Sequence, residues 1–450
     1  MNLLLKSKNF IKENRLIIII FLIELSYFFI QHYKFFSWDL NVYRLNGRYF
    51  IGESTYFEWL RPPLLPLLFT IFSFLGNLDY YIIIFLILLL FYYSVYLFCK
   101  KFNFNYKIMI LLYLTPMFIG YGFFAGTEIL SLSLIILFIT SLDTKYSGLL
   151  FGLMFLTRYT TLLFGILILF NKRLKNYVYF IFGSILIVLP WLVYNYLITG
   201  NLLTSILDSY LLSVVVRTNI FRINDFYHII LFGSLFILFF IGVFYRIKKI
   251  KKIDIIILLA GLITLYSFIM IPSKEPRYLF HLILPLTYFS YFAYQKHKKL
   301  FIFAILINLI AVGAMFFSIH DYKLTQFEDA LKHVDECGIS SNGWVMLNSL
   351  GRASEPTPYM DLVEDRLDKG YRLILFNSLF EPEYKDDKFF LNKFNLIYKN
   401  DKYSIYGDKD KCVKLDKYEM IYMERYKEHI QKITGEEVKL TTFNILFKKV

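Results

Sequence analysis

Apolar runs recur from Leu16 to Ser318 and constrain this sequence more than any other feature. A helix that crosses a bilayer needs about 20 mostly apolar residues, because lipid offers its backbone no hydrogen-bond partners. The chain of 450 residues is 57% hydrophobic and 20% aromatic, which exceeds what the core of a water-soluble protein needs. The sequence therefore predicts an α-helical polytopic membrane protein.

Run length and flanking charge predict about eleven transmembrane helices. They are residues 16–30, 80–99, 107–122, 128–141, 146–157, 160–171, 177–197, 226–246, 254–272, 277–294 and 299–318. Residues 61–76 begin with prolines and are followed by Asn77 and Asp79, so we interpret them as an outer interfacial helix. Residues 32–79 as a whole are then an outer loop.

Lysine and arginine gather in alternate loops of this arrangement, as the positive-inside rule requires. The cationic segments are residues 6–15, 100–107, 145, 172–175, 246–252 and 296–299. They predict a multi-pass protein of the cell membrane with a cytoplasmic N-terminus. The net charge of +14 then reflects loops that face anionic membrane lipids, and no nucleic-acid partner is predicted. The first apolar run lacks a small-residue cleavage site and is predicted to remain as an anchor.

The composition changes near His320, after which Lys, Asp, Glu and Asn become frequent. We predict a transmembrane domain over 1–319 and a soluble, extracytoplasmic α/β domain over 320–450. Residues 371–376 resemble a buried strand, and residues 395–406 resemble two strands joined by a polar turn. Cys337 and Cys412 both fall in this outer part and are predicted to pair, whereas Cys99 is predicted to be a packed thiol.

Charged residues gather at the outer ends of the predicted spans, where each charge in hydrocarbon costs about 2.5–3.5 kcal/mol. These residues are Asp39, Arg61, Glu128, Arg158, Glu275 and Arg277, with Tyr278 beside the last. They are predicted to form one outward-facing site, in which they pair with one another or with a polar ligand. Two simpler interpretations stay open: Arg277 pairs only with Glu275, and Glu128 only caps its helix.

Six elements in this order resemble membrane glycosyltransferases of the GT-C fold, over roughly residues 10 to 320. The likeness is greatest to the branch of family 39 that holds protein O-mannosyltransferases and aminoarabinose transferases. The elements are Asp39 after the first span, Arg61-Pro62-Pro63, Glu128 at the start of the fourth span, GLLFGLMFLTRYT (148–160), LPWLVYNYLITGN (189–201) and KEPRYLFHLILP (274–285). The resemblance implies a transmembrane catalytic domain.

The resemblance further implies transfer of a hexose or pentose from a polyprenyl- or dolichyl-phosphate donor to an extracytoplasmic lipid, glycan or protein. Asp39 matches the catalytic acid of the family, which would act as general base, and Glu128 is grouped with it. The donor phosphate would be bound by Arg61, Arg158, Arg277, Tyr278 and Arg44, with Glu275 in support. Members of the family carry a second acid or a nearby arginine after the first acid. Here Leu40 follows directly, and Arg44 is assigned that place.

No nucleotide-binding glycine motif, metal-spaced His/Cys cluster or internal repeat is evident in the sequence. No cofactor is therefore predicted, and a divalent metal is not excluded. The main alternative is a transporter or flippase of a lipid-linked sugar, and a third is a noncatalytic scaffold that tolerates loss of Asp39. The outer loop 199–226, with Arg217 and Arg222, is predicted either to contact donor or acceptor or to anchor at the interface.

Overall fold

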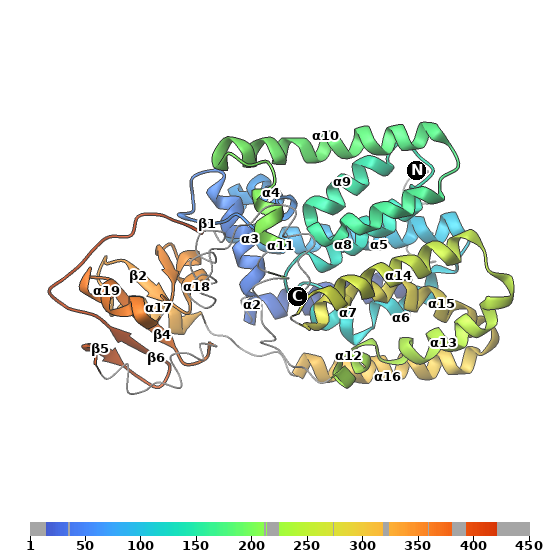
Figure 1. The fold of residues 1–450 in the computed structure, drawn as a ribbon. Helices are drawn as coiled ribbons and strands as arrows, with labels where there is room; N and C mark the ends of the chain where they lie inside the picture. The colour runs from blue at the N-terminus through green and yellow to red at the C-terminus, as the bar shows by residue number, and fades with distance from the viewer. Residues whose placement is uncertain are drawn as a thin grey trace, which may run out of the picture.

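The computed structural model describes residues 15–34, 37–210, 213, 225–272, 274–317, 324–358, 360–379 and 393–420. Two parts lie side by side in Figure 1. A bundle of helices occupies the right of the view, and a smaller unit built on a β-sheet occupies the left. The segment that contains α3 (Trp38–Tyr49) and β1 (Tyr56–Glu58) lies between them.

The bundle consists of α-helices joined by short turns and several 3₁₀-helices (η). They are α2 (Arg15–Lys34), α3, α4 (Leu64–Phe72), η1 (Ser73–Leu78), α5 (Asp79–Phe102), η2 (Tyr106–Met109), α6 (Ile110–Tyr113), α7 (Pro116–Tyr121), α8 (Glu128–Thr140), α9 (Ser147–Thr157), η3 (Tyr159–Phe170), α10 (Leu174–Thr199), α11 (Thr204–Tyr210), α12 (Asp225–Phe232), α13 (Ser234–Arg246), η5 (Ile247–Lys249), α14 (Lys252–Met270), η6 (Pro276–Leu282), α15 (Ile283–Lys296) and α16 (Lys298–Phe317). One apolar core runs through it.

Five helical stretches within the described residues are long and apolar enough to cross a membrane. They are Arg15–Lys34, Leu64–Phe102, Leu174–Thr199, Lys252–Met270 and Lys298–Phe316. Shorter apolar helices occupy Glu128–Thr140, Ser147–Thr157 and Tyr159–Phe170. Many aliphatic and aromatic side chains of α10 and α16 face outward, as a lipid environment favours. The helical fold is thus as predicted, and the total of eleven crossings stays a prediction.

Three of the predicted spans are interrupted helices in the structure. Residues 107–122 divide into η2, α6 and α7, with a break at Thr115, whose ψ of 132° fits a residue that precedes proline. Residues 226–246 divide into α12 and α13 at Gly233, whose φ of 53° suits glycine alone. Residues 277–294 begin as η6 before α15. Hydropathy alone does not reveal such breaks.

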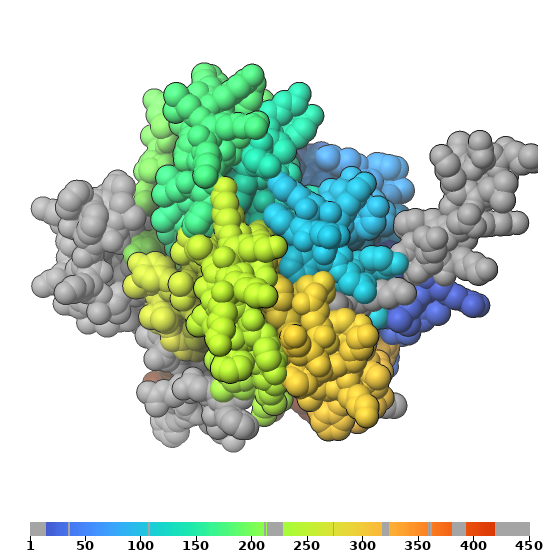
Figure 2. Space-filling model, turned by 90° about the vertical axis from the view of Figure 1, so that its right-hand side faces the viewer, coloured from blue at the N-terminus to red at the C-terminus, as the bar shows by residue number. Residues whose placement is uncertain are grey.

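Several of the cationic loops meet at the end of the bundle opposite the sheet unit, which faces the viewer in Figure 2. Lys101 forms an ion pair with Asp143. Asn171 donates a hydrogen bond from Nδ2 to the carbonyl of Leu142 at 2.5 Å. Lys251, Lys101 and Asp143 line one cavity. Loops that the positive-inside rule assigns to one side thus lie together.

The smaller unit is a mixed five-stranded sheet with helices. Its strands are β2 (Ile339–Ser341), β3 (Ser354–Pro356), β4 (Arg372–Phe376), β5 (Leu396–Lys399) and β6 (Tyr403–Tyr406), and its helices are α17 (Thr325–Leu331), α18 (Trp344–Ser349), η7 (Met360–Leu362) and α19 (Val363–Asp368). The strand order is β3-β2-β4-β6-β5. The strands β2, β3 and β4 pair in parallel, and β6 pairs antiparallel with β4 and β5. The buried strand and the hairpin expected from the sequence are both present.

A disulfide joins Cys337 to Cys412, with 5.1 Å between their Cα atoms, and Cys99 is a buried free thiol. The C-terminal part also reaches back to the outer loop. Strand β7 (Tyr418–Met420) pairs in parallel with β1, in the register of Tyr56 with Tyr418. The C-terminal part thus contains its own five-stranded sheet and, through β7, forms a second, two-stranded sheet with the segment after α3.

Candidate functional site

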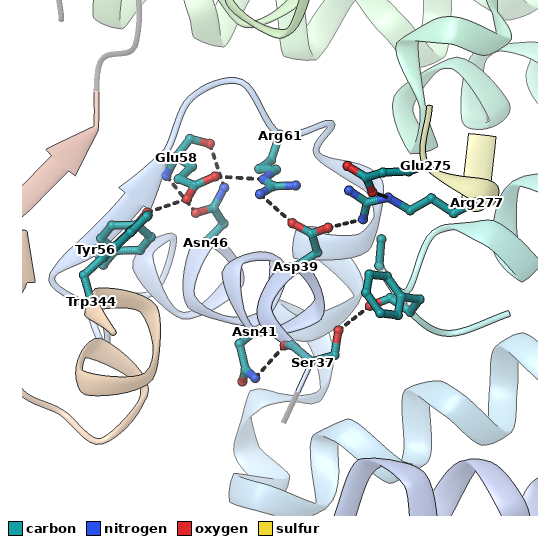
Figure 3. Close-up of polar contacts among 12 residues, drawn as sticks. Ser37, Asp39, Asn41, Asn46, Tyr56, Glu58, Arg61, Glu275, Arg277 and Trp344 are labelled. Atoms are coloured by element: carbon teal, nitrogen blue, oxygen red, sulfur yellow. Dashed lines mark hydrogen bonds and ion pairs between the residues drawn. The ribbon is translucent and has the colours of Figure 1, made fainter. Parts of the chain in front are cut away.

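Asp39 lies in the first turn of α3, where a negative charge is favoured by the positive end of the helix. Two side-chain hydrogen bonds hold the start of α3. The Ser37 hydroxyl donates to the carbonyl of Phe124, and Asn41 donates from Nδ2 to the carbonyl of Ser37 at 2.8 Å. The first turn of α3 is therefore fixed against the segment that precedes α8 (Figure 3).

Asp39 contacts two arginines that come from distant parts of the chain. Its Oδ1 lies 2.8 Å from Nη2 of Arg61, and its Oδ2 contacts Nη1 of Arg277. Figure 3 shows the carboxylate between the two guanidinium groups. Arg61 follows β1 in the outer loop, while Arg277 comes from η6, beyond α14. The structure thus brings Asp39 together with Arg277, which lies 238 positions further along the chain.

Each arginine near the site contacts a glutamate of its own. Arg61 Nε lies 2.8 Å from Glu58 Oε2, Arg158 Nη1 lies 3.2 Å from Glu128 Oε1, and Arg277 Nε lies 2.5 Å from Glu275 Oε2. The side chains of Glu58 and Glu128 are at most 1% exposed. A buried carboxylate is stable only when paired, so these glutamates also fix the arginines in position.

A cavity of about 130 Å³ opens at the centre of this group. Its lining includes Asp39, Arg61, Arg158, Arg277 and Tyr278. Among the described residues, the lining thus carries three guanidinium groups and one carboxylate, a positive excess that suits an anion. The cavity is smaller than typical ligand pockets of roughly 300–1,000 Å³. A phosphate-sized group fits within it, and the remainder of a larger ligand would extend outside.

Uncharged polar side chains complete the cavity wall, among them Tyr43, Thr127, Tyr159 and Ser209. Burial raises the pKa of the Tyr43 hydroxyl, although the neighbouring Arg61 lowers it in part. Tyr43 therefore keeps its proton at neutral pH. The guanidinium of Arg61 also lies over the Tyr43 ring, 5.5 Å from its centroid. Tyr159 accepts a hydrogen bond from Nε1 of Trp191 at 2.9 Å, which orients its hydroxyl.

Of the residues expected at the site from the sequence, some line the cavity, some lie behind it, and one, Arg44, lies elsewhere. Asp39, Arg61, Arg158, Arg277 and Tyr278 line the cavity. Glu128 and Glu275 lie behind it, each against an arginine, so the simpler interpretation of pairing with Glu275 describes only part of the contacts of Arg277. Glu128 also accepts a hydrogen bond from the backbone N–H of Ala125 at 3.1 Å.

Arg44 lies elsewhere, which corrects its assignment to the donor phosphate. Its Nε lies 3.0 Å from Asp79, and its Nη2 donates to the side chain of Asn77 at 2.8 Å. Asp79 is fully buried and begins α5, so its charge requires this partner. Arg44 thereby anchors α3 to α5 and does not line the cavity. Arg217 and Arg222 lie outside the described residues.

Sequence reasoning missed Glu58, the buried partner of Arg61. Its position three residues before Arg61 in Glu58-Trp59-Leu60-Arg61 was the available signal. Tyr56 and Trp344 were missed as well, because nothing in the sequence indicates that the C-terminal unit contacts the outer loop. Within the part of the chain that the structure describes, no group of three or more His, Cys, Asp or Glu side chains is arranged to hold a metal ion.

The arrangement of the helices is that of the GT-C fold. The structure is similar to the crystal structure of ArnT from Cupriavidus metallidurans in the apo state, with a TM-score of 0.61. The match covers 88% of this chain and 98% of the other, at 9% sequence identity. The prediction of a GT-C fold is thus confirmed. No family model and no curated protein sequence matches the chain.

Proposed function

We propose that the protein is a membrane glycosyltransferase that moves a sugar from a polyprenyl-phosphate donor to an acceptor outside the cytoplasm. The observation that carries the proposal is the cavity in which Asp39 lies between Arg61 and Arg277. A carboxylate beside several arginines offers a base and a phosphate site within one small volume. The ArnT-like fold supports the same reaction class.

The donor phosphate would bind to Arg61, Arg277 and Arg158. Arginine suits this role because its planar fork binds phosphate oxygens in pairs. A phosphate that enters the cavity competes with Asp39 for the same guanidinium groups. We propose that donor binding thereby weakens the ion pairs of Asp39 and leaves its carboxylate available to the acceptor, while the glutamates behind continue to hold the arginines.

The reaction is then a direct displacement at the anomeric carbon. The acceptor oxygen forms a bond to that carbon as its proton passes to Asp39, and the bond from the carbon to the phosphate oxygen breaks. The electron pair leaves with the polyprenyl phosphate, whose additional negative charge is stabilised by the arginines. The anomeric configuration is inverted. Glu128, held between Arg158 and the N–H of Ala125, positions Arg158 and is not the base in this proposal.

We propose an orientation with the N-terminus in the cytoplasm and the sheet unit outside. The meeting of the cationic loops at the opposite end supports this orientation through the positive-inside rule. The Cys337–Cys412 disulfide supports it as well, because disulfides persist in oxidising compartments. The donor sugar is a hexose or pentose, and the acceptor is a lipid, a glycan or a protein.

The test is sugar release by the purified protein in lipid nanodiscs, with a panel of radiolabelled polyprenyl-phosphate sugars. We expect turnover by the wild type, and a loss of about 10²–10⁴-fold in Asp39→Asn, which removes the base. Binding of polyprenyl phosphate should persist in this variant, since the arginines remain. If no donor is turned over but labelled lipid crosses the bilayer, the protein is a flippase and the proposal is wrong.

A further inference from the structure

A continuous chain of polar contacts connects the C-terminal unit to Asp39 (Figure 3). Trp344, the first residue of α18, donates from Nε1 to the hydroxyl of Tyr56 at 2.9 Å. Tyr56 in turn donates to Oε1 of Glu58. The other oxygen of Glu58 lies 2.8 Å from Arg61, which reaches Asp39. We call these five residues, Trp344, Tyr56, Glu58, Arg61 and Asp39, the polar relay.

The direction of every hydrogen bond in the polar relay is fixed by chemistry. An indole N–H only donates, and an ionised carboxylate only accepts. The hydroxyl of Tyr56 therefore accepts from Trp344 and must direct its own proton to Glu58. Arg61, which also only donates, approaches Glu58 from the other oxygen. The arrangement has one consistent set of donors and acceptors, so loss of the Trp344 donor removes one of the groups that orient the Tyr56 hydroxyl.

Glu58, the last residue of β1, is also held through its backbone. Its backbone N–H donates to Oδ1 of Asn46 at 2.9 Å, and its carbonyl accepts from Nδ2 of the same side chain at 2.8 Å. Both Tyr56 and Glu58 are buried, with exposed fractions of 0% and 1%. A buried charge depends on each of its few partners, so the orientation of Glu58 is sensitive to the Tyr56 hydroxyl.

The C-terminal unit is packed against this part of the outer loop by apolar contacts as well. The rings of Trp344 and Trp38 meet edge to face, with centroids 4.6 Å apart. Val345 packs with Val42 and Leu45 of α3. The pairing of β7 with β1 adds a second connection, which includes a hydrogen bond from the N–H of Tyr418 to the carbonyl of Thr55 at 2.8 Å.

We infer that Trp344 and Tyr56 are positioning residues, through which the C-terminal unit orients Arg61 for the donor phosphate. The inference rests on the proposed function and goes beyond it, since it assigns a role to the C-terminal unit. Neither residue lines the cavity. Their effect passes through Glu58 to the guanidinium of Arg61, and from there to Asp39. The C-terminal unit accordingly supports the phosphate site without lining the cavity.

The experiment compares Trp344→Phe, Tyr56→Phe and the double variant. Tyr56→Phe removes the hydroxyl and keeps the ring, whereas Trp344→Phe removes the indole N–H and leaves a smaller aromatic ring against Trp38. We expect kcat/KM for the polyprenyl-phosphate sugar to fall about five- to tenfold in each, with an equal rise in the Kd of polyprenyl phosphate. The double variant should match Tyr56→Phe alone, because Trp344 acts only through the Tyr56 hydroxyl.

The matched control is Tyr403→Phe. Tyr403 is also a buried tyrosine that donates to a carboxylate, Asp329 Oδ2 at 2.8 Å, but this contact lies within the C-terminal unit and apart from the polar relay. We expect Tyr403→Phe to leave kcat/KM and phosphate affinity at wild-type values. Thermal melting of all variants is recorded, so that a change in stability is separated from a change in phosphate binding.

Three results would overturn the inference, and they differ from one another. Single variants that match Tyr403→Phe in phosphate affinity, with an active wild type, would refute the polar relay and leave the proposed function intact. A further loss caused by Trp344→Phe in the Tyr56→Phe background would show that Trp344 acts through packing. A wild type that neither turns over nor binds any polyprenyl phosphate would refute the proposed function, and the inference with it.

Discussion

Arg61 and Arg277 each contact both a glutamate and Asp39. Each of the two guanidinium groups therefore lies between two carboxylates. The planar fork of arginine allows these two contacts at once, because its N–H groups point in fixed and different directions. A lysine ammonium is a single point of charge and cannot reproduce both. At the scale of the residue, the shape of the cation therefore matters as much as its charge.

Arg61→Lys should consequently weaken polyprenyl-phosphate binding about tenfold or more, although the net charge is unchanged. Arg44→Lys is the matched control, since Arg44 pairs with the buried Asp79 and does not line the cavity. We expect it to lower thermal stability and to leave phosphate affinity unchanged. Titration of polyprenyl phosphate into both variants is the measurement. Equal losses of affinity would restore Arg44 to the phosphate site.

Single residues also show where sequence reasoning stops. Asp39, Arg61 and Arg277 were predictable because charges at the ends of apolar spans are costly and therefore need partners. The choice of partner was not predictable, since Asp39 and Arg277 are separated by 238 positions and meet only after α14 packs in place. Glu58 was missed because nothing in the sequence shows that the segment around it is buried.

Helices α3 and α4 approach each other closely at Gly47. A Cβ atom at this position would lie 2.6 Å from the carbonyl oxygen of Pro66 and 2.7 Å from Cβ of Phe69. The Thr70 hydroxyl also donates to the carbonyl of Gly47 at 2.8 Å. At the scale of the element, this contact sets the distance between the helix that carries Asp39 and the segment that follows Arg61.

Gly47→Ala should therefore separate α3 from α4 and lower the free energy of unfolding by about 1–3 kcal/mol, the usual cost of overpacking. Gly313→Ala in α16 is the control. Nothing lies within 4 Å of a Cβ there, and alanine favours the helix, so stability should stay equal or rise slightly. Thermal melting in nanodiscs measures both. A stable Gly47→Ala protein would mean that α4 shifts freely.

The positions of most elements followed from the sequence, whereas their continuity did not. Apolar length predicted α5, α8, α10, α14 and α16, because burial in lipid depends on composition. The breaks at Thr115 and Gly233 depend on local backbone geometry and neighbouring helices. The hairpin β5–β6 was predictable from its alternating pattern and polar turn.

At the scale of the whole molecule, each part is stabilised in its own way. The bundle has one apolar core, and the sheet unit has a disulfide between residues 75 positions apart. A disulfide over a loop of this length stabilises a folded domain by about 2–5 kcal/mol. It lies near the segment that leads to β7, because Cys412 precedes that strand by six residues. The stability of the sheet unit and the pairing of β7 with β1 are therefore coupled.

A protein with Cys337→Ser and Cys412→Ser should melt at a lower temperature than the wild type, and dithiothreitol should have no further effect on it. Cys99→Ala is the control, since this thiol is buried and free. The control should keep the sensitivity of the wild type to the reductant. Differential scanning fluorimetry with and without dithiothreitol distinguishes the two. Unchanged melting of the double serine variant would contradict a stabilising disulfide.

The parallel pairing of β1 with β7 has a consequence for biosynthesis. One strand lies at residues 56–58 and the other at 418–420, so the first is synthesised long before the second has been translated. Until the last part of the chain emerges, β1 has no partner and the neighbourhood of Arg61 is incomplete. A ribosome-bound nascent chain with all its helices inserted would accordingly stay inactive, and activity would begin only when synthesis is nearly finished.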